Sequence, residues 1–107
     1  MITAILNGYK RPHTLSEQYE AIKSQTIDDV DIMFWGNYHE DSMESFPSDV
    51  IEKCTSAFCN KNLGVWARFA YALNAGTEYV CVFDDDTIPG KRWLENCLET
   101  MKTHRGL

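Results

Sequence analysis

Apolar residues follow two periodicities along the chain, and together they predict strands that alternate with helices. Short runs rich in β-branched and aromatic residues predict strands at 2–6, 30–35, 56–59 and 79–83. Apolar residues at helical spacing predict helices at about 14–24, at 66–75 and from 93 onward, and a short helix is expected at 48–53. Because strands alternate with helices, we expect an α/β fold with a mostly parallel sheet.

The distribution of apolar residues also predicts which parts are buried. The strand at 79–83 is nearly all apolar, which is typical of a central parallel strand covered by helices on both faces. The aromatic residues Trp66, Phe69 and Trp93 lie on predicted helix faces, so we expect them in the core rather than on a base-stacking surface.

Length and charge exclude several classes of protein. A chain of 107 residues is expected to form a single domain, 1–107, and is short for a complete nucleotide-dependent enzyme. Sixteen acidic against ten basic residues give a net charge of −6, which disfavours a nucleic-acid partner. No apolar run approaches the roughly 20 residues of a membrane span, and no signal segment precedes the first strand, so we expect a soluble, cytoplasmic protein. A small unit with an uncovered sheet edge would gain from forming a homo-oligomer.

Cysteine usage points to free thiols rather than to a zinc site or a disulfide framework. The four cysteines, Cys54, Cys59, Cys81 and Cys97, form no C-x-x-C pair of the kind found in structural zinc sites. Cys81 and Cys97 sit within apolar patterns, as buried free thiols do.

Polar residues follow three of the predicted strands, and the most conspicuous are three consecutive aspartates. In an open parallel sheet, ligands bind beyond the carboxyl ends of the strands, where Asn7, Asn37 and the run Asp84-Asp85-Asp86 would meet. Extended backbone would put Asp84 and Asp86 on one side, where Mg²⁺ or Mn²⁺ could bind them together with substrate phosphates. The alternative is that the aspartates are solvated turn residues or cap the following helix.

Arg68 is the basic residue best placed to join this site. It lies one turn into the predicted helix that follows Asn62-Leu63-Gly64, where a guanidinium could hold a ligand phosphate with two hydrogen bonds. An exposed helix arginine with no ligand is the other interpretation of the same position.

These clusters, in this order, resemble the inverting family 2 glycosyltransferases and their relatives with the GT-A fold. The resemblance covers nearly the whole chain and is carried by residues 5–12 with Leu15, by Gln25-Thr26, by Asn62-Leu63-Gly64 with Arg68, and by the DXD segment Phe83-Asp84-Asp85-Asp86 with Pro89. It implies a Rossmann-like α/β/α fold of three layers, truncated after the DXD segment and its following helix.

The resemblance also implies a nucleotide-diphosphate sugar as donor, such as a UDP- or GDP-sugar, a Mn²⁺ or Mg²⁺ ion, and a glycan or other hydroxyl acceptor. The donor site that it implies consists of Asn7, Tyr9, Arg11, Asn37, Gly64, Arg68, Asp84 and Asp85. Asp84 would approach the ribose or a metal-bound water, and Asp86 would bind the metal directly. Family members usually carry an aspartate after the second strand, which accepts a hydrogen bond from the imino group of the base. This chain has Gly36-Asn37 there, and the amide oxygen of Asn37 could accept the same hydrogen bond.

Two other functions fit parts of the sequence. No catalytic base or acceptor-binding segment has a counterpart in the chain, so a non-catalytic nucleotide-sugar-binding or assembly module is the first alternative. A phosphatase of the haloacid dehalogenase type also places Asp-x-Asp after an apolar strand. In such a phosphatase the aspartates open the domain, but here only about twenty residues follow them, which disfavours it.

Overall fold

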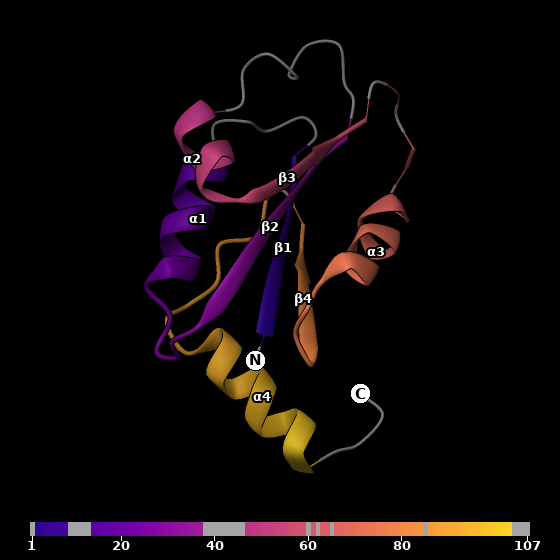
Figure 1. The fold of residues 1–107 in the computed structure, drawn as a ribbon. Helices are drawn as coiled ribbons and strands as arrows, with labels where there is room; N and C mark the ends of the chain where they lie inside the picture. Colours follow the sequence, from indigo (N-terminus) through magenta and orange to yellow (C-terminus); the bar gives the residue numbers. More distant parts are fainter. Residues whose placement is uncertain are drawn as a thin grey trace.

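The computed structural model describes residues 2–8, 14–37, 47–59, 61, 63–64, 66–84 and 86–103, which form one sheet flanked by helices (Figure 1). In chain order the elements are β1 (Ile2–Gly8), α1 (Leu15–Lys23), β2 (Val30–Gly36), α2 (Ser48–Lys53), β3 (Thr55–Phe58), α3 (Ala67–Tyr71), the 3-10 helix η3 (Ala72–Asn74), β4 (Tyr79–Phe83) and α4 (Trp93–Thr103). Each predicted element is present, and its observed boundaries lie within about two residues of the predicted ones.

The sheet is fully parallel, as predicted, with strand order β3-β2-β1-β4. The prediction that 79–83 is a central strand is wrong. Among the described residues β4 pairs with β1 alone, and Val80 is 39% exposed. The inner positions belong to β2 and β1, and β1 is the more completely covered of the two, because all seven of its residues are buried.

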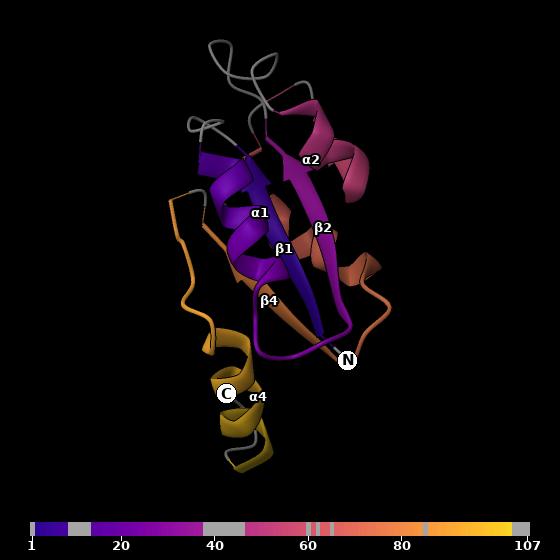
Figure 2. The same cartoon turned by 90° about the vertical axis from the view of Figure 1, so that its left-hand side faces the viewer.

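The helices lie on both faces of the sheet, which confirms the three-layer arrangement. In Figure 1, α1 and α2 stand on one side of the strands and α3 on the other, and the quarter turn of Figure 2 shows α1 in front of the sheet with α3 behind it. The hydrophobic core lies between the sheet and the helices α1 and α2. Leu15, Tyr19 and Ile22 of α1 pack with Leu6 and Phe34 of the sheet.

The opposite face of the sheet is covered far less completely. The helix predicted at 66–75 is a five-residue α-helix continued by η3, and it has no buried residue. Trp66 is 76% exposed, Phe69 51% and Trp93 49%, so the expectation that these aromatic residues belong to the core is wrong. The physical reason on α3 is that Arg68 and Tyr71 occupy its inward side and make polar contacts there.

None of the helices in the described part of the chain is long and apolar enough to cross a membrane.

All four cysteines are free thiols, as predicted, and each is half-buried rather than fully buried. Burial raises the pKa of the Cys54 thiol to about 11, with Lys23 acting weakly in the opposite direction. The thiolate fraction at neutral pH is therefore about a hundredfold below that of an ordinary cysteine.

We expect Cys54 to be alkylated by iodoacetamide at pH 7.5 at least tenfold more slowly in the folded protein than in urea, since the thiolate is the reactive form. Mass spectrometry of tryptic peptides over time measures this rate. Equal alkylation rates in the folded and unfolded protein would contradict the raised pKa of Cys54.

The raised pKa also has a consequence for stability. Because the folded state binds the Cys54 proton more tightly than the unfolded state does, the contribution of Cys54 to stability is present below the ordinary thiol pKa and is lost as the pH rises towards 11.

Candidate functional site

The carboxyl ends of β1 and β2 are joined at one edge of the sheet. The backbone N–H of Asn37 donates to the carbonyl of Gly8 at 2.8 Å, which extends the pairing of the two strands by one residue. Asn7 is buried next to this junction, at 3% exposure. The sequence places polar groups here because each strand ends in an Asn-Gly or Gly-Asn step that stops the apolar run.

Asn37 has a role that the sequence did not predict. Its side chain is buried, and its Oδ1 accepts a hydrogen bond of 3.0 Å from the backbone N–H of Leu63. This bond fixes the loop that carries Gly64 against the end of β2. The expected contact between Asn37 and a nucleotide base stays a prediction, and a base would have to share that oxygen with the loop.

Gly64 follows with a backbone conformation that favours glycine. Its φ is +77°, in the left-handed region, and a Cβ there would meet nothing within 4 Å. Any other residue would be strained by the backbone rather than by crowding. The space where a side chain would stand at Gly64 is therefore open, close to the start of α3 in the sequence.

The central contact of the site joins Arg68 to Asp84. Arg68 Nη1 donates to Asp84 Oδ1 at 2.7 Å. The side chain of Arg68 is only 11% exposed, whereas that of Asp84 is 72% exposed. The sequence proposed separate roles for these two residues, one on a phosphate and one on a ribose or metal. The structure brings them together, so a cationic side chain already compensates one of the three aspartates.

Asp84 and Asp86 lie at a turn rather than in the extended backbone that the sequence suggested. The N–H of Thr87 donates to the carbonyl of Asp84 at 3.2 Å, which is the i to i+3 bond of a β-turn, and Asp86 is an exposed corner residue. The expectation that extended backbone puts Asp84 and Asp86 on one side of a strand is therefore wrong. Aspartate favours turns, which is consistent with β4 ending at Phe83, directly before Asp84.

Within the described residues no group of three or more His, Cys, Asp and Glu side chains is arranged to hold a metal ion. Asp85 lies outside these residues, as do Tyr9 and Arg11, so their predicted contacts with the donor stay predictions. The described candidate ligands are the carboxylates of Asp84 and Asp86.

Two buried glutamines of the α1 segment hold the aspartate turn and the chain that follows it. Gln18 donates from Nε2 to the carbonyls of Asp84 and Thr87, both at 2.7 Å. Gln25 donates to the carbonyl of Gly90 at 2.7 Å, and its Oε1 accepts from the N–H of Leu94 at 3.0 Å. The two side chains thus anchor both ends of the segment between β4 and α4 to α1.

Sequence reasoning missed the role of Gln18, although a signal was present. Position 18 lies on the same helix face as Leu15, Tyr19 and Ile22, so a glutamine there had to be a buried polar residue in need of partners. Gln25 was noted only as part of a resemblance, and its hydrogen bonds explain why an amide is useful there.

We expect Gln18→Leu to weaken nucleotide binding more than it weakens the fold. The change removes two hydrogen bonds at a site with no exposure, which should cost about 1–2 kcal/mol of unfolding free energy and leave the aspartate turn loosely positioned. Gln25→Leu is the matched control, since it removes bonds to residues 90 and 94, farther from the aspartates. Urea unfolding together with calorimetric titration of a nucleoside diphosphate would separate the two effects. Similar losses of affinity in both variants would contradict the role given to Gln18.

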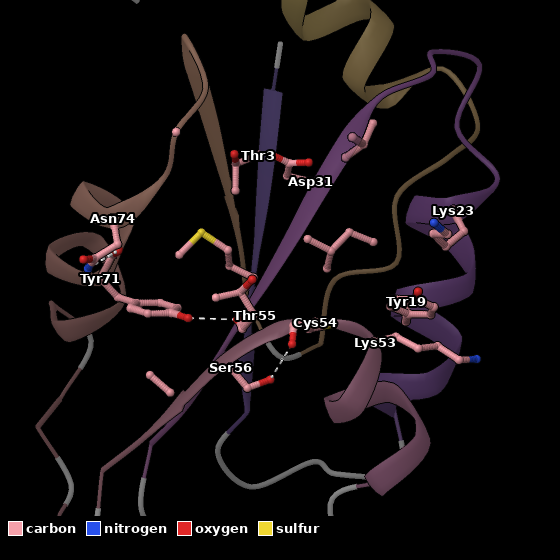
Figure 3. Close-up of a pocket in the computed structure, with 15 residues that line it drawn as sticks. Thr3, Tyr19, Lys23, Asp31, Lys53, Cys54, Thr55, Ser56, Tyr71 and Asn74 are labelled. Carbon is pink, nitrogen blue, oxygen red and sulfur yellow. Dashed lines mark hydrogen bonds between the residues drawn. The ribbon is translucent and has the colours of Figure 1, made fainter.

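A separate hollow of about 710 Å³ lies at the other end of the strands (Figure 3). It exists because β3 begins opposite Met33, so the first residues of β2 have no partner in β3. Lys23 and Lys53 reach it from one side and Tyr71 from the other. Of the predicted donor-site residues that the structure describes, none lines this hollow.

Comparison with known proteins agrees with the architecture described above. The profile of the family described as glycosyl transferase family 2 matches residues 3–106. The chain belongs to this family. No curated protein sequence matches the chain at a significant level.

Solved structures of S. aureus TarS share the fold of this family 2 domain. TarS 1–349 superposes with a TM-score of 0.75 at 16% sequence identity, covering 96% of this chain and 32% of that one. A crystal structure of a longer chain of S. aureus TarS gives a TM-score of 0.76 at 16% identity, with 96% of this chain and 20% of that one covered. TarS 1–349 has also been solved in complex with UDP and with UDP-GlcNAc. The chain thus spans about a third of TarS 1–349.

Proposed function

We propose that this family 2 domain binds a nucleotide-diphosphate sugar at the carboxyl ends of β1, β2 and β4, as the donor for transfer of a glycosyl group to an acceptor hydroxyl. The observation that carries the proposal is the Arg68–Asp84 pair, which lies at the end of β4 beside the exposed Asp86. The TarS complexes with UDP and UDP-GlcNAc support a UDP-sugar as the donor, because they show this fold with such a ligand.

The residues present suit a divalent cation. The Asp84 carboxylate is largely exposed, and Arg68 engages its Oδ1. Carboxylate oxygens together with substrate phosphates are the usual ligands of Mg²⁺ and Mn²⁺. Asp86 would hold the ion directly and Asp84 would approach it through water or contact the ribose. When bound, such an ion neutralises the departing diphosphate.

The protein groups have separable tasks in this proposal. Arg68 fixes the orientation of Asp84, and Gln18 fixes the backbone on which Asp84 is carried. The segment at Gly64, held by Asn37, is proposed to lie beside the phosphates, where the absence of a side chain leaves space. Tyr9, Arg11 and Asn37 are proposed to contact the base and ribose.

A binding module that depends on another polypeptide for turnover is the second candidate. These 107 residues correspond to about a third of TarS 1–349, so transfer by this part of the fold alone is a separate question from donor binding. The two candidates agree on the donor site and differ in whether these 107 residues suffice for transfer.

A thermal-shift panel of nucleoside diphosphates and sugar nucleotides, with and without Mn²⁺, tests the shared donor site. A ligand that binds only the folded state raises its apparent stability, by about 2.7 kcal/mol at a hundred times Kd. We expect UDP-sugars to raise Tm, and to raise it more with Mn²⁺. Release of nucleoside diphosphate over time would favour the enzyme over the module, and no shift with any nucleotide would reject both.

A further inference from the structure

Two of the four free thiols meet between β4 and α4. Side chains alternate along a strand, so Cys81 lies on the same face of β4 as Phe83, which is buried in the core with α1. On α4, Leu94 is fully buried and Leu98 packs against the same core. Cys97 lies one turn beyond Leu94, so the inner side of α4 carries this thiol towards β4.

The two thiols are in direct contact. The thiol of Cys81 donates a hydrogen bond to the sulfur of Cys97, and the side chain of Trp93 donates one to the sulfur of Cys81. Cys54 and Cys59 flank β3, which is separated from β4 by two strands of the sheet. The pair at positions 81 and 97 is therefore the one that the fold prepares to react.

The contact also distinguishes the two thiols chemically. Burial raises the pKa of both, which keeps their reactions slow at neutral pH. The hydrogen bond from Cys81 acts in the opposite direction at Cys97, because it stabilises the thiolate of Cys97. Thiol–disulfide exchange begins with attack by a thiolate, so this hydrogen bond favours Cys97 as the first thiol to attack.

We propose that Cys81 and Cys97 form a reversible disulfide that joins β4 to α4 under oxidising conditions. With glutathione disulfide as the oxidant, the thiolate of Cys97 attacks one glutathione sulfur and releases one glutathione thiolate. Cys81 then loses its proton, attacks the Cys97 sulfur of the mixed disulfide and releases the second glutathione. The two cysteines are oxidised, one glutathione disulfide is reduced, and the two thiol protons end on the two glutathiones.

The disulfide would close the loop 82–96, which contains Asp84 and Asp86. The side chains of Gln18 and Gln25 already hold the backbone of this loop. A disulfide stabilises a protein mainly by restricting the unfolded chain, and here the two sulfurs are already in contact in the folded chain. We therefore expect the oxidised protein to unfold at a Tm about 5–10 °C above that of the reduced protein.

Oxidation with glutathione disulfide, followed by tryptic digestion without reductant and mass spectrometry, tests the pairing. Trypsin cuts between Cys81 and Cys97, which fall on the peptides 69–91 and 93–102. We expect the cross-link between these two peptides to be at least about tenfold more abundant than a cross-link between any other two peptides, because the fold holds the two sulfurs together. In urea this preference should disappear.

Cys97→Ser tests whether this disulfide accounts for the gain in stability. Treated with glutathione disulfide, the variant should show no rise in Tm. Cys59→Ser is the matched control, because it removes a half-buried thiol outside the pair and should keep the rise. Circular dichroism of the reduced variants confirms that they are folded.

Three results would overturn the proposal. They are a wild-type protein whose Cys81 and Cys97 stay reduced or carry separate glutathiones, cross-links that are equally abundant for all pairs of peptides, and an oxidised protein with the Tm of the reduced one. None of these measurements involves a nucleotide, so failure of the disulfide and failure of the donor site are distinguishable.

Discussion

Replacing Asp86 by alanine should abolish the Mn²⁺-dependent part of sugar-nucleotide binding. Asp86 is exposed at the corner of the turn that follows β4, where it is the proposed direct ligand of the cation. Without it the diphosphate and the remaining carboxylates repel each other, which should cost at least about 2 kcal/mol, or roughly thirtyfold in Kd. Calorimetric titration of a UDP-sugar with and without Mn²⁺ measures the difference.

Asp31→Ala is the matched control for this variant. Asp31 is an exposed carboxylate near the start of β2, at the opposite end of the strands. Removing it changes the net charge by the same amount and should leave both the affinity and its dependence on Mn²⁺ unaltered. An Asp86→Ala protein that binds as tightly as the wild type would reject Asp86 as a metal ligand.

Replacing Arg68 by methionine is expected to weaken nucleoside diphosphate binding about tenfold, equivalent to ~1.4 kcal/mol. Methionine keeps an unbranched apolar side chain at this largely buried position but removes the guanidinium that holds Asp84 Oδ1. Asp84 then loses its fixed orientation. Because Asp84 is largely exposed, water can solvate it, so the fold should be destabilised by less than the binding.

Arg92→Met provides the comparison. Arg92 also pairs with a carboxylate, donating from Nε to Glu95 Oε2 at 2.8 Å, but it lies at the start of α4 on the surface. Its loss should not change nucleotide affinity. A tenfold loss of nucleotide affinity in both Arg68→Met and Arg92→Met would mean that positive charge alone, rather than the orientation of Asp84, governs binding. In that case Arg68→Lys, which keeps the charge, would bind as the wild type does.

The sequence predicted the order and type of the elements well because each has a strong local signal. β1 is short, apolar and stopped by Asn7-Gly8, and α1 has a regular apolar face, so neither depends on distant contacts. The position of each strand in the sheet has no such signal. β4 looks central by composition, yet in the part of the chain that the structure describes it pairs only with β1, because composition records how apolar a strand is and not which neighbours it has.

The same limit explains α3. Periodicity identified a face at 66, 69 and 73, but it could not say that Arg68 and Tyr71 would bind the sheet side and turn that face outward. An apolar face predicts the buried side of a helix only where that face is the one that packs against the sheet.

The candidate site was predictable in its position and less so in its contacts. The carboxyl ends of parallel strands must meet at one edge, which placed Asn7, Asn37 and Asp84 together from sequence alone. The pairing of Arg68 with Asp84, and the bond from Leu63 to Asn37, depend on side-chain geometry between segments far apart in the chain. Local patterns carry no information on such contacts.

A crystal of the protein soaked with Mn²⁺ and a UDP-sugar would examine the donor site most directly. The expected result is anomalous density for manganese between Asp86 and the diphosphate, with Arg68 still paired to Asp84 and the nucleoside lying over the ends of β1 and β2. Clear density for the aspartates with neither ion nor nucleotide among them, at ligand concentrations that saturate other family 2 domains, would contradict the assignment of a donor site here.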